Sequence, residues 1–213
     1  MENLDIEGNL RTYLGDRTPT ARYTSFDYCF NYFRGAREEG RLDDLLVGAN
    51  LQLSCLQLGY YLASWGMFRG GAELLQRSLK ALVPAVKTIV SAPAELWDLD
   101  ADRYTKSNIT SILNYAQTLR GPLPGGQSDI LVTKVMLGTF CCVPAFDRNF
   151  MSGFAVSTFG RKSLRKIGEF YEKNSYVVDQ YRLATLDFDS GTPTTHRYTR
   201  AKVIDMIFFI EGA

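Results

Sequence analysis

Apolar residues recur at spacings of three and four along most of the chain, which is the period of an amphipathic helix. In residues 25–36, for example, Phe26, Cys29, Phe30 and Phe33 fall on one helical face. The pattern predicts an all-α fold. We expect further helices at residues 43–68, 72–82, 105–120, 129–140, 157–173, 177–188 and 199–212, with additional short helices after Pro84 and Pro144.

The stretch from Leu45 to Phe68 carries no charge and is long enough to span a bilayer. Its polar positions argue against that reading, because each would need a hydrogen-bond partner in hydrocarbon: Asn50, Gln52, Ser54, Gln57 and Ser64. We expect a helix buried in the middle of the domain instead. The N-terminal segment lacks the charged start and apolar run of a signal peptide, so we expect a cytoplasmic protein with no membrane partner.

No long linker and no internal repeat divides the 213 residues, which predicts one compact helical domain over residues 1–213. The formal net charge of +1 excludes a basic footprint over the whole chain but not a local basic face. With a single histidine, His196, a multi-histidine metal centre is excluded. The four cysteines have no disulfide or zinc spacing, and we expect Cys141 and Cys142 to be buried, reduced thiols with raised pKa values. We therefore expect no metal, no cofactor and no thiol chemistry.

A glycine-rich turn separates two of the predicted helices. It reads Leu123-Pro124-Gly125-Gly126-Gln127, and Ser128 is placed to cap the helix that begins at Asp129. After that helix comes PAFDRNF at residues 144–150. In this order, the elements resemble the core of the helix-hairpin-helix DNA glycosylases. They also look like uncharacterised bacterial proteins that close with a K/R-x-x-D-x-x-x-[FW] helix, which here supplies Lys202, Asp205 and Phe209.

The resemblance covers about residues 105–150 and the last fifteen residues. It implies that the hairpin presents backbone N–H groups to a DNA phosphate, with contacts at Gly125, Gly126, Gln127, Ser128 and Arg148. It also implies that Asp147 is the catalytic carboxylate. The hairpin lacks the usual second glycine, and the position of the family's nucleophilic lysine falls on Ser128 or Asp129. The resemblance thus favours monofunctional hydrolysis over lyase chemistry.

Base excision requires stabilisation of an oxocarbenium-like sugar and a positioned water, which a partly buried carboxylate can supply. We expect Asp147 at the rim of a pocket in that role; the alternative is that it only caps the short helix that it begins. Lys134 is the one charge in an otherwise apolar helix. It must snorkel to solvent, face a pocket, or pair with a carboxylate such as Asp147 or Asp205.

Two further groups are candidates for contacts with DNA. The helix at 161–173 is the most basic stretch and either follows a phosphate backbone or forms a solvated face, with Arg161, Lys162, Arg165 and Lys166 as the candidate contacts. In YYLASWGMFRG at 60–70, Tyr61, Trp65 and Arg69 are candidates for a base pocket, although the aromatic residues are equally compatible with core packing.

Three hypotheses follow. The first is a DNA glycosylase-like enzyme that excises a damaged or modified base, in DNA repair or in defence against modified phage DNA. The second is a helical module that binds DNA or a protein without catalysis. The third is an unrelated helical enzyme or scaffold in which LPGG is only a turn. Whether Asp147 faces a cavity separates the first two, and a groove beside the turn separates both from the third.

Overall fold

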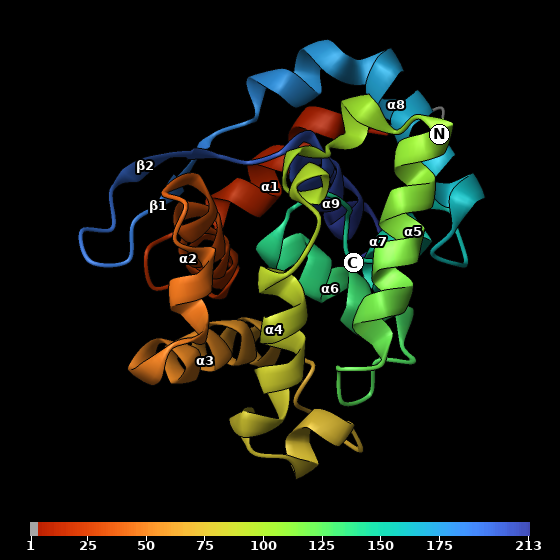
Figure 1. Cartoon of the computed structure of the whole chain (residues 1–213). Coiled ribbons are helices and arrows are strands. Elements are labelled where there is room, and N and C mark those ends of the chain that lie inside the picture. The colour runs from red at the N-terminus through yellow and green to blue at the C-terminus, as the bar shows by residue number, and fades with distance from the viewer. Residues whose placement is uncertain (1–3) are drawn as a thin grey trace.

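A computed structural model describes residues 4–213 and confirms that the fold is mostly helical. Figure 1 shows the described helices gathered around α6 and α9. The described helices are α1 (Ile6–Gly15), α2 (Ser25–Glu38), α3 (Gly48–Ser64), α4 (Val83–Val90), α5 (Lys106–Arg120), α6 (Asp129–Thr139), α7 (Arg148–Phe154), α8 (Arg161–Gln180) and α9 (Arg200–Glu211). Single 3₁₀ turns connect several of them. Met1–Asn3, at the start of the segment in which we expect no signal peptide, lie outside the described residues.

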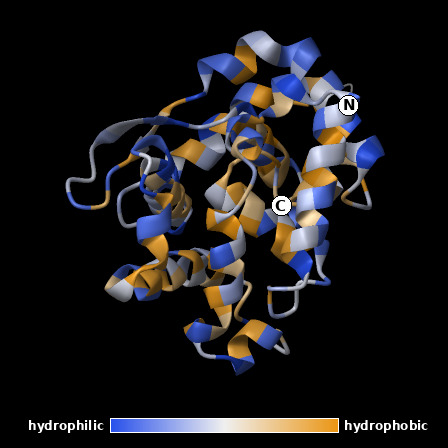
Figure 2. Ribbon diagram, in the orientation of Figure 1, coloured by the Kyte–Doolittle hydropathy of each residue, from blue (hydrophilic) through white to orange (hydrophobic). Residues whose placement is uncertain are grey.

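The two central helices are α6 and α9. All residues from Leu131 to Thr139 of α6 are buried, as are all those from Ala201 to Phe208 of α9. A helix that is apolar on all sides has to be covered on all sides. Accordingly, α2, α3 and α5 pack on α6, and α1, α7 and α8 pack on α9. The amphipathic outer helices turn their hydrophilic residues outward, as the colouring of Figure 2 shows.

The predicted helix at 43–68 is wrong in both extent and position. Residues Leu42–Leu46 form a 3₁₀ turn, and α3 begins only at Gly48, whose φ of 53° breaks the helix. This helix lies at the edge of the fold, because only one of its faces is buried while Leu53, Leu56 and Tyr60 are exposed. Its lack of charge therefore marks an apolar outer surface, and the central position belongs to α6. None of the helices in residues 4–213 is long and apolar enough to cross a membrane.

Two other predicted helices are also corrected. Residues 72–82 contain two 3₁₀ turns, Glu73–Gln76 and Leu79–Leu82, in place of one helix. The predicted helix at 177–188 is instead the end of α8 followed by strand β1 (Ala184–Leu186), which pairs antiparallel with β2 (Pro193–Arg197). Threonines at 192, 194 and 195 favour this hairpin over helix because they are β-branched.

Candidate functional site

Lys134 and Asp147 form an ion pair at the centre of the molecule. Lys134 Nζ lies 3.0 Å from Asp147 Oδ2, and the side chains are 5% and 14% exposed, respectively. Of the alternatives open to Lys134, the structure thus shows pairing with Asp147. Asp147 is also the N-cap of α7, since its Oδ1 accepts a hydrogen bond from Phe150 N–H at 3.1 Å. The expected capping role and a position beside a cavity therefore occur together.

A second buried ion pair lies beside the first. Lys202 Nζ is 2.9 Å from Asp205 Oδ2 and donates to the Tyr13 hydroxyl, also at 2.9 Å. The other Asp205 oxygen accepts the Ala145 N–H. Burial opposes the Lys202 charge, but the nearby Asp205 carboxylate and Tyr13 hydroxyl outweigh burial and raise the pKa of the ammonium above its ordinary value. Burial also raises the pKa of Tyr13 to about 12. Lys202 is therefore held as a cation at neutral pH.

An aromatic cluster covers the two ion pairs. The Tyr13 and Tyr23 rings stack with centroids 4.3 Å apart, and Tyr23 stacks on Trp65 at 5.5 Å. Phe209 presents an edge-to-face contact to all three rings. The ammonium groups of Lys134 and Lys202 each lie 5.5 Å from the Trp65 ring centroid. The indole therefore has cations as well as aromatic rings among its neighbours.

The cavity between these groups is very small. Its volume is about 10 Å³, and it is lined by Tyr61, Trp65, Lys134, Leu137, Ala145, Asp147, Lys202, Asp205 and Phe209. Such a space holds at most a single water molecule. The indole nitrogen of Trp65 is buried and has no hydrogen-bond acceptor among the residues described. A nucleobase does not fit into a space of this size.

The three residues expected to form a base pocket have different positions. Trp65 lines the cavity, and Tyr61 lies beneath it, fully buried, with its hydroxyl donating to the Lys134 carbonyl at 3.0 Å. Arg69 is exposed and folds over Gly66 instead of lining the cavity. The loop that follows α3 therefore contributes the Trp65 indole to the site, but not the Arg69 guanidinium.

The turn between α5 and α6 is tightly built. Gly125 has a φ of 76°, and a side chain on Gly126 would place its Cβ 2.1 Å from the Arg120 carbonyl oxygen. The N–H groups of Gly125 and Gln127 donate to no group in residues 4–213, whereas that of Gly126 bonds Leu123 O. Ser128 is the N-cap residue of α6 but makes no side-chain capping bond there, unlike the expectation.

Asp129 gives the start of α6 a negative charge of its own. Its carboxylate pairs with Arg120, which also donates to the carbonyls of Gly126 and Gln127, and it accepts the Phe159 N–H. Arg120 therefore holds the turn in shape and offsets the Asp129 charge. The N–H groups of Gly125 and Gln127 are left as the donors that an anion would reach.

The five basic side chains expected to contact DNA fall into two groups. Arg148 of α7 and Lys162 and Arg165 of α8 are exposed. By contrast, Lys166 Nζ donates to the carbonyls of Phe154 and Ala155 at the end of α7, and Arg161 donates to the Thr110 hydroxyl of α5. Lys166 and Arg161 thus tie helices together, and the remaining three cations face solvent.

Several residues around the cavity had no role in the sequence analysis: Tyr13, Arg22 and Tyr23. They come from α1 and from the 3₁₀ turn Arg22–Thr24, with the Arg22 guanidinium 5.3 Å from the Trp65 ring centroid. No spacing or motif marks them. Lys202 and Asp205 carried a signal, because they are charges three residues apart in an otherwise apolar helix.

The cysteines behave as expected. All four are unpaired in residues 4–213, and burial raises the pKa of Cys141 to about 12 and that of Cys142 further. Within the same residues, no three His, Cys, Asp or Glu side chains converge as metal ligands. The charged groups of the site are therefore the two lysines and two carboxylates.

Comparison of the chain with protein-family models, with curated proteins and with solved structures finds no match.

Proposed function

We propose that the chain is a DNA glycosylase-like enzyme that excises a damaged or modified base by monofunctional hydrolysis, with Asp147 as the catalytic carboxylate. The observation that carries the proposal is the position of the Asp147 side chain. It lines an interior cavity beside Lys134, yet at 14% exposed it is the more accessible of the two carboxylates there, against 7% for Asp205. In this proposal α5, the Leu123–Gln127 turn and α6 act as the helix-hairpin-helix element.

The proposed reaction needs one water and no cofactor. The bond between C1′ and the base nitrogen breaks, and its electron pair leaves with the base, which is protonated from solvent. The Asp147 carboxylate stabilises the positive charge that develops on the sugar and takes a proton from the water as that water bonds to C1′. Lys134, within 3.0 Å, keeps this carboxylate oriented toward the cavity.

Because the cavity is only about 10 Å³ in volume, the side chains around it have to move before a base can bind there. Trp65 directly follows α3, and its neighbour Gly66 has a φ of 77°, so the chain turns sharply next to the indole. A flipped base would displace the indole and inherit its ring contacts with Tyr23 and Phe209. In this view the ring stack occupies the base site when DNA is absent.

DNA would be bound by charge and by the turn. The N–H groups of Gly125 and Gln127 are free to meet a phosphate, and Lys162, Arg165 and Arg148 are free to contact others. The Asp129 carboxylate would repel such a phosphate, but its charge is offset by the ion pair with Arg120.

One observation favours the alternative, a helical module that binds DNA or a protein without catalysis. Both Asp147 oxygens are already engaged, one by the Phe150 N–H and one by Lys134. That geometry is sufficient for a helix cap and an ion pair, with no reaction required. The two functions differ in whether base loss depends on Asp147.

The deciding experiment is abasic-site formation on a panel of duplexes, each with one deaminated, alkylated, oxidised or bulky modified base. Protein in excess over DNA followed by hot alkali converts every excised base to a strand break. We expect breaks with the wild type on at least one duplex and a loss of two or more orders of magnitude with Asp147→Asn. Asp5→Asn is the matched control, because Asp5 caps α1 through Gly8 N–H as Asp147 caps α7. DNA binding without breaks on any duplex would instead support the non-catalytic module.

A further inference from the structure

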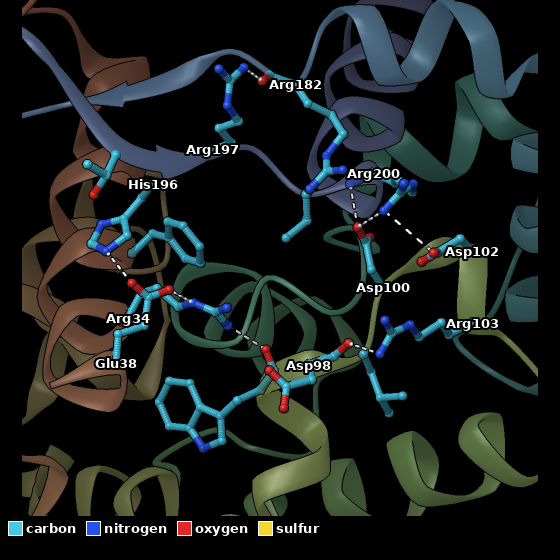
Figure 3. Close-up of a pocket in the computed structure, with 15 residues that line it drawn as sticks. Arg34, Glu38, Asp98, Asp100, Asp102, Arg103, Arg182, His196, Arg197 and Arg200 are labelled. Carbon is cyan, nitrogen blue, oxygen red and sulfur yellow. Dashed lines mark hydrogen bonds and ion pairs between the residues drawn. The ribbon is translucent and has the colours of Figure 1, made fainter. Parts of the chain in front are cut away.

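A second cavity, separate from the Lys134 and Asp147 site, opens on the surface between α2, the 3₁₀ turns at 94–103 and the β-hairpin (Figure 3). Its volume is about 540 Å³, within the usual range for small-molecule sites. It shares no lining residue with the interior cavity. Its lining is rich in arginine: Arg34, Arg103, Arg182, Arg197 and Arg200.

Two of the five arginines are used by carboxylates of the chain itself. Arg34 pairs with Glu38 at 2.7 Å, and Glu38 also bonds His196. Arg200 lies between Asp100, Asp102 and Asp179, at 3.6, 3.5 and 2.9 Å. Asp100 additionally caps α9 by accepting the N–H groups of Arg200 and Ala201. These groups build the walls of the cavity and are not available to a ligand.

The other three arginines have no carboxylate within 4.0 Å in residues 4–213. Each is instead held by a backbone carbonyl. Arg182 donates from Nε to Tyr198 O at 3.1 Å, Arg197 donates from Nη1 to Arg182 O at 3.1 Å, and Arg103 donates from Nη1 to Asp98 O at 3.5 Å. A guanidinium has five N–H donors, so most of the donors on each remain unused. The backbone therefore orients Arg182 and Arg197, and none of the three is in an ion pair.

Arg182 and Arg197 are linked to one another. The Arg197 side chain reaches back to the Arg182 carbonyl and its guanidinium points away from the hollow, whereas the Arg182 side chain runs toward Asp100 and Arg200 (Figure 3). Planar guanidinium groups of this kind bind phosphate through paired, charge-assisted hydrogen bonds. On the opposite wall the exposed Asp98 carboxylate has no cation within 4.0 Å in the described chain, and it can accept from hydroxyl or amino groups.

We propose that this cavity binds a small organic phosphate of about mononucleotide size. Its phosphate would bind the N–H groups of Arg182 that remain unused, and its hydroxyl or amino groups would donate to Asp98 on the facing wall. A bare inorganic anion would use only the arginine half of the cavity. The proposal is independent of base excision, since it shares no residue with that site.

The test is calorimetric titration of the full chain with inorganic phosphate, ribose 5-phosphate and a mononucleotide. We expect the mononucleotide to bind more tightly than inorganic phosphate. Arg182→Gln should weaken both by about tenfold, because it removes the charge-assisted contacts to the phosphate. Asp98→Asn should weaken the mononucleotide and leave inorganic phosphate unchanged.

Arg77→Gln is the matched control, since Arg77 is an exposed arginine that lines neither cavity. Thermal melting of each variant verifies that it folds. The proposal is overturned if the wild type shows no binding of any of the three phosphates at millimolar concentration, or if Arg77→Gln weakens binding as much as Arg182→Gln does. A short single-stranded DNA is titrated in the same way, and the proposal is also overturned if this DNA alone binds in an Arg182-dependent way, which would make the cavity a nucleic-acid contact.

Discussion

Lys134 of α6 and Asp147 at the start of α7 are joined across the core by an ion pair of 3.0 Å, although thirteen positions separate them in the chain. The Lys134 ammonium also donates to the Trp65 carbonyl at 3.0 Å. One side chain thus connects the carboxylate proposed for catalysis to an aromatic residue that lines the cavity. Any displacement of Trp65 has to break or rearrange a Lys134 contact.

Lys134→Met should both loosen the Trp65 loop and leave Asp147 without its cation. We expect the free energy of unfolding to fall by about 1–3 kcal/mol, since a partly buried carboxylate loses its partner. In a double-mutant cycle with Asp147→Asn, urea titrations should give a coupling of about 1 kcal/mol or more. Additive effects of the two substitutions would show that the pair does not interact measurably.

Asp205→Asn should destabilise the chain more than Asp147→Asn does. Lys202 is 1% exposed. Burial lowers the pKa of its ammonium, and the Asp205 carboxylate is the main group that raises it again. Loss of the Asp205 charge therefore leaves a buried ammonium without a partner. The expected loss is about 3–5 kcal/mol in urea unfolding. The control is Lys202→Met combined with Asp205→Leu, which removes both charges and should recover much of the loss. A double variant as unstable as the single one would indicate a packing defect.

The sequence predicted those helices in which the hydrophobic periodicity and the helix-ending residues indicate the same boundaries. The face formed by Phe26, Cys29, Phe30 and Phe33 is buried in α2, and α5 ends at Arg120, directly before Gly121-Pro122. It failed where an uncharged stretch was taken as a sign of burial. Because α6 is only eleven residues long, its complete burial depends on neighbours that arrive from distant parts of the chain.

The candidate site was predictable only in part, for the same reason. Asp147 and Lys134 stood out because each is a charge in an apolar setting, and such charges need partners. Tyr13 and Tyr23 reach the cavity only through the packing of α1 on α9, which leaves no local pattern. The turn was anticipated as an exposed phosphate contact, yet Gly126 is buried against the end of α5.

Gly126→Ala should therefore damage folding first, although the resemblance implies that this turn contacts a DNA phosphate. The added Cβ would meet Arg120 O at 2.1 Å, and overpacking of this kind costs about 1–3 kcal/mol or more. Gly125→Ala should cost about 1–2 kcal/mol because of its φ of 76°. Gly121→Ala is the control, since a Cβ there meets nothing within 4 Å. Equal melting temperatures for the 126 and 121 variants would contradict this assignment.

Alkaline pH should destabilise the chain through its buried thiols. Burial raises the pKa values of Cys29, Cys141 and Cys142 far above those of the thiols in the unfolded chain. Between the unfolded pKa, about 8.5, and the folded values, the unfolded chain binds fewer protons, so the unfolding free energy falls as pH rises. Each thiol contributes about 1.4 kcal/mol per pH unit there. Urea unfolding at pH 7.0, 8.5 and 9.5 measures this slope, and Cys142→Ala should reduce it, whatever its effect on stability at pH 7. A slope that is unchanged in Cys142→Ala would mean that this thiol ionises in the folded protein and is reachable from solvent.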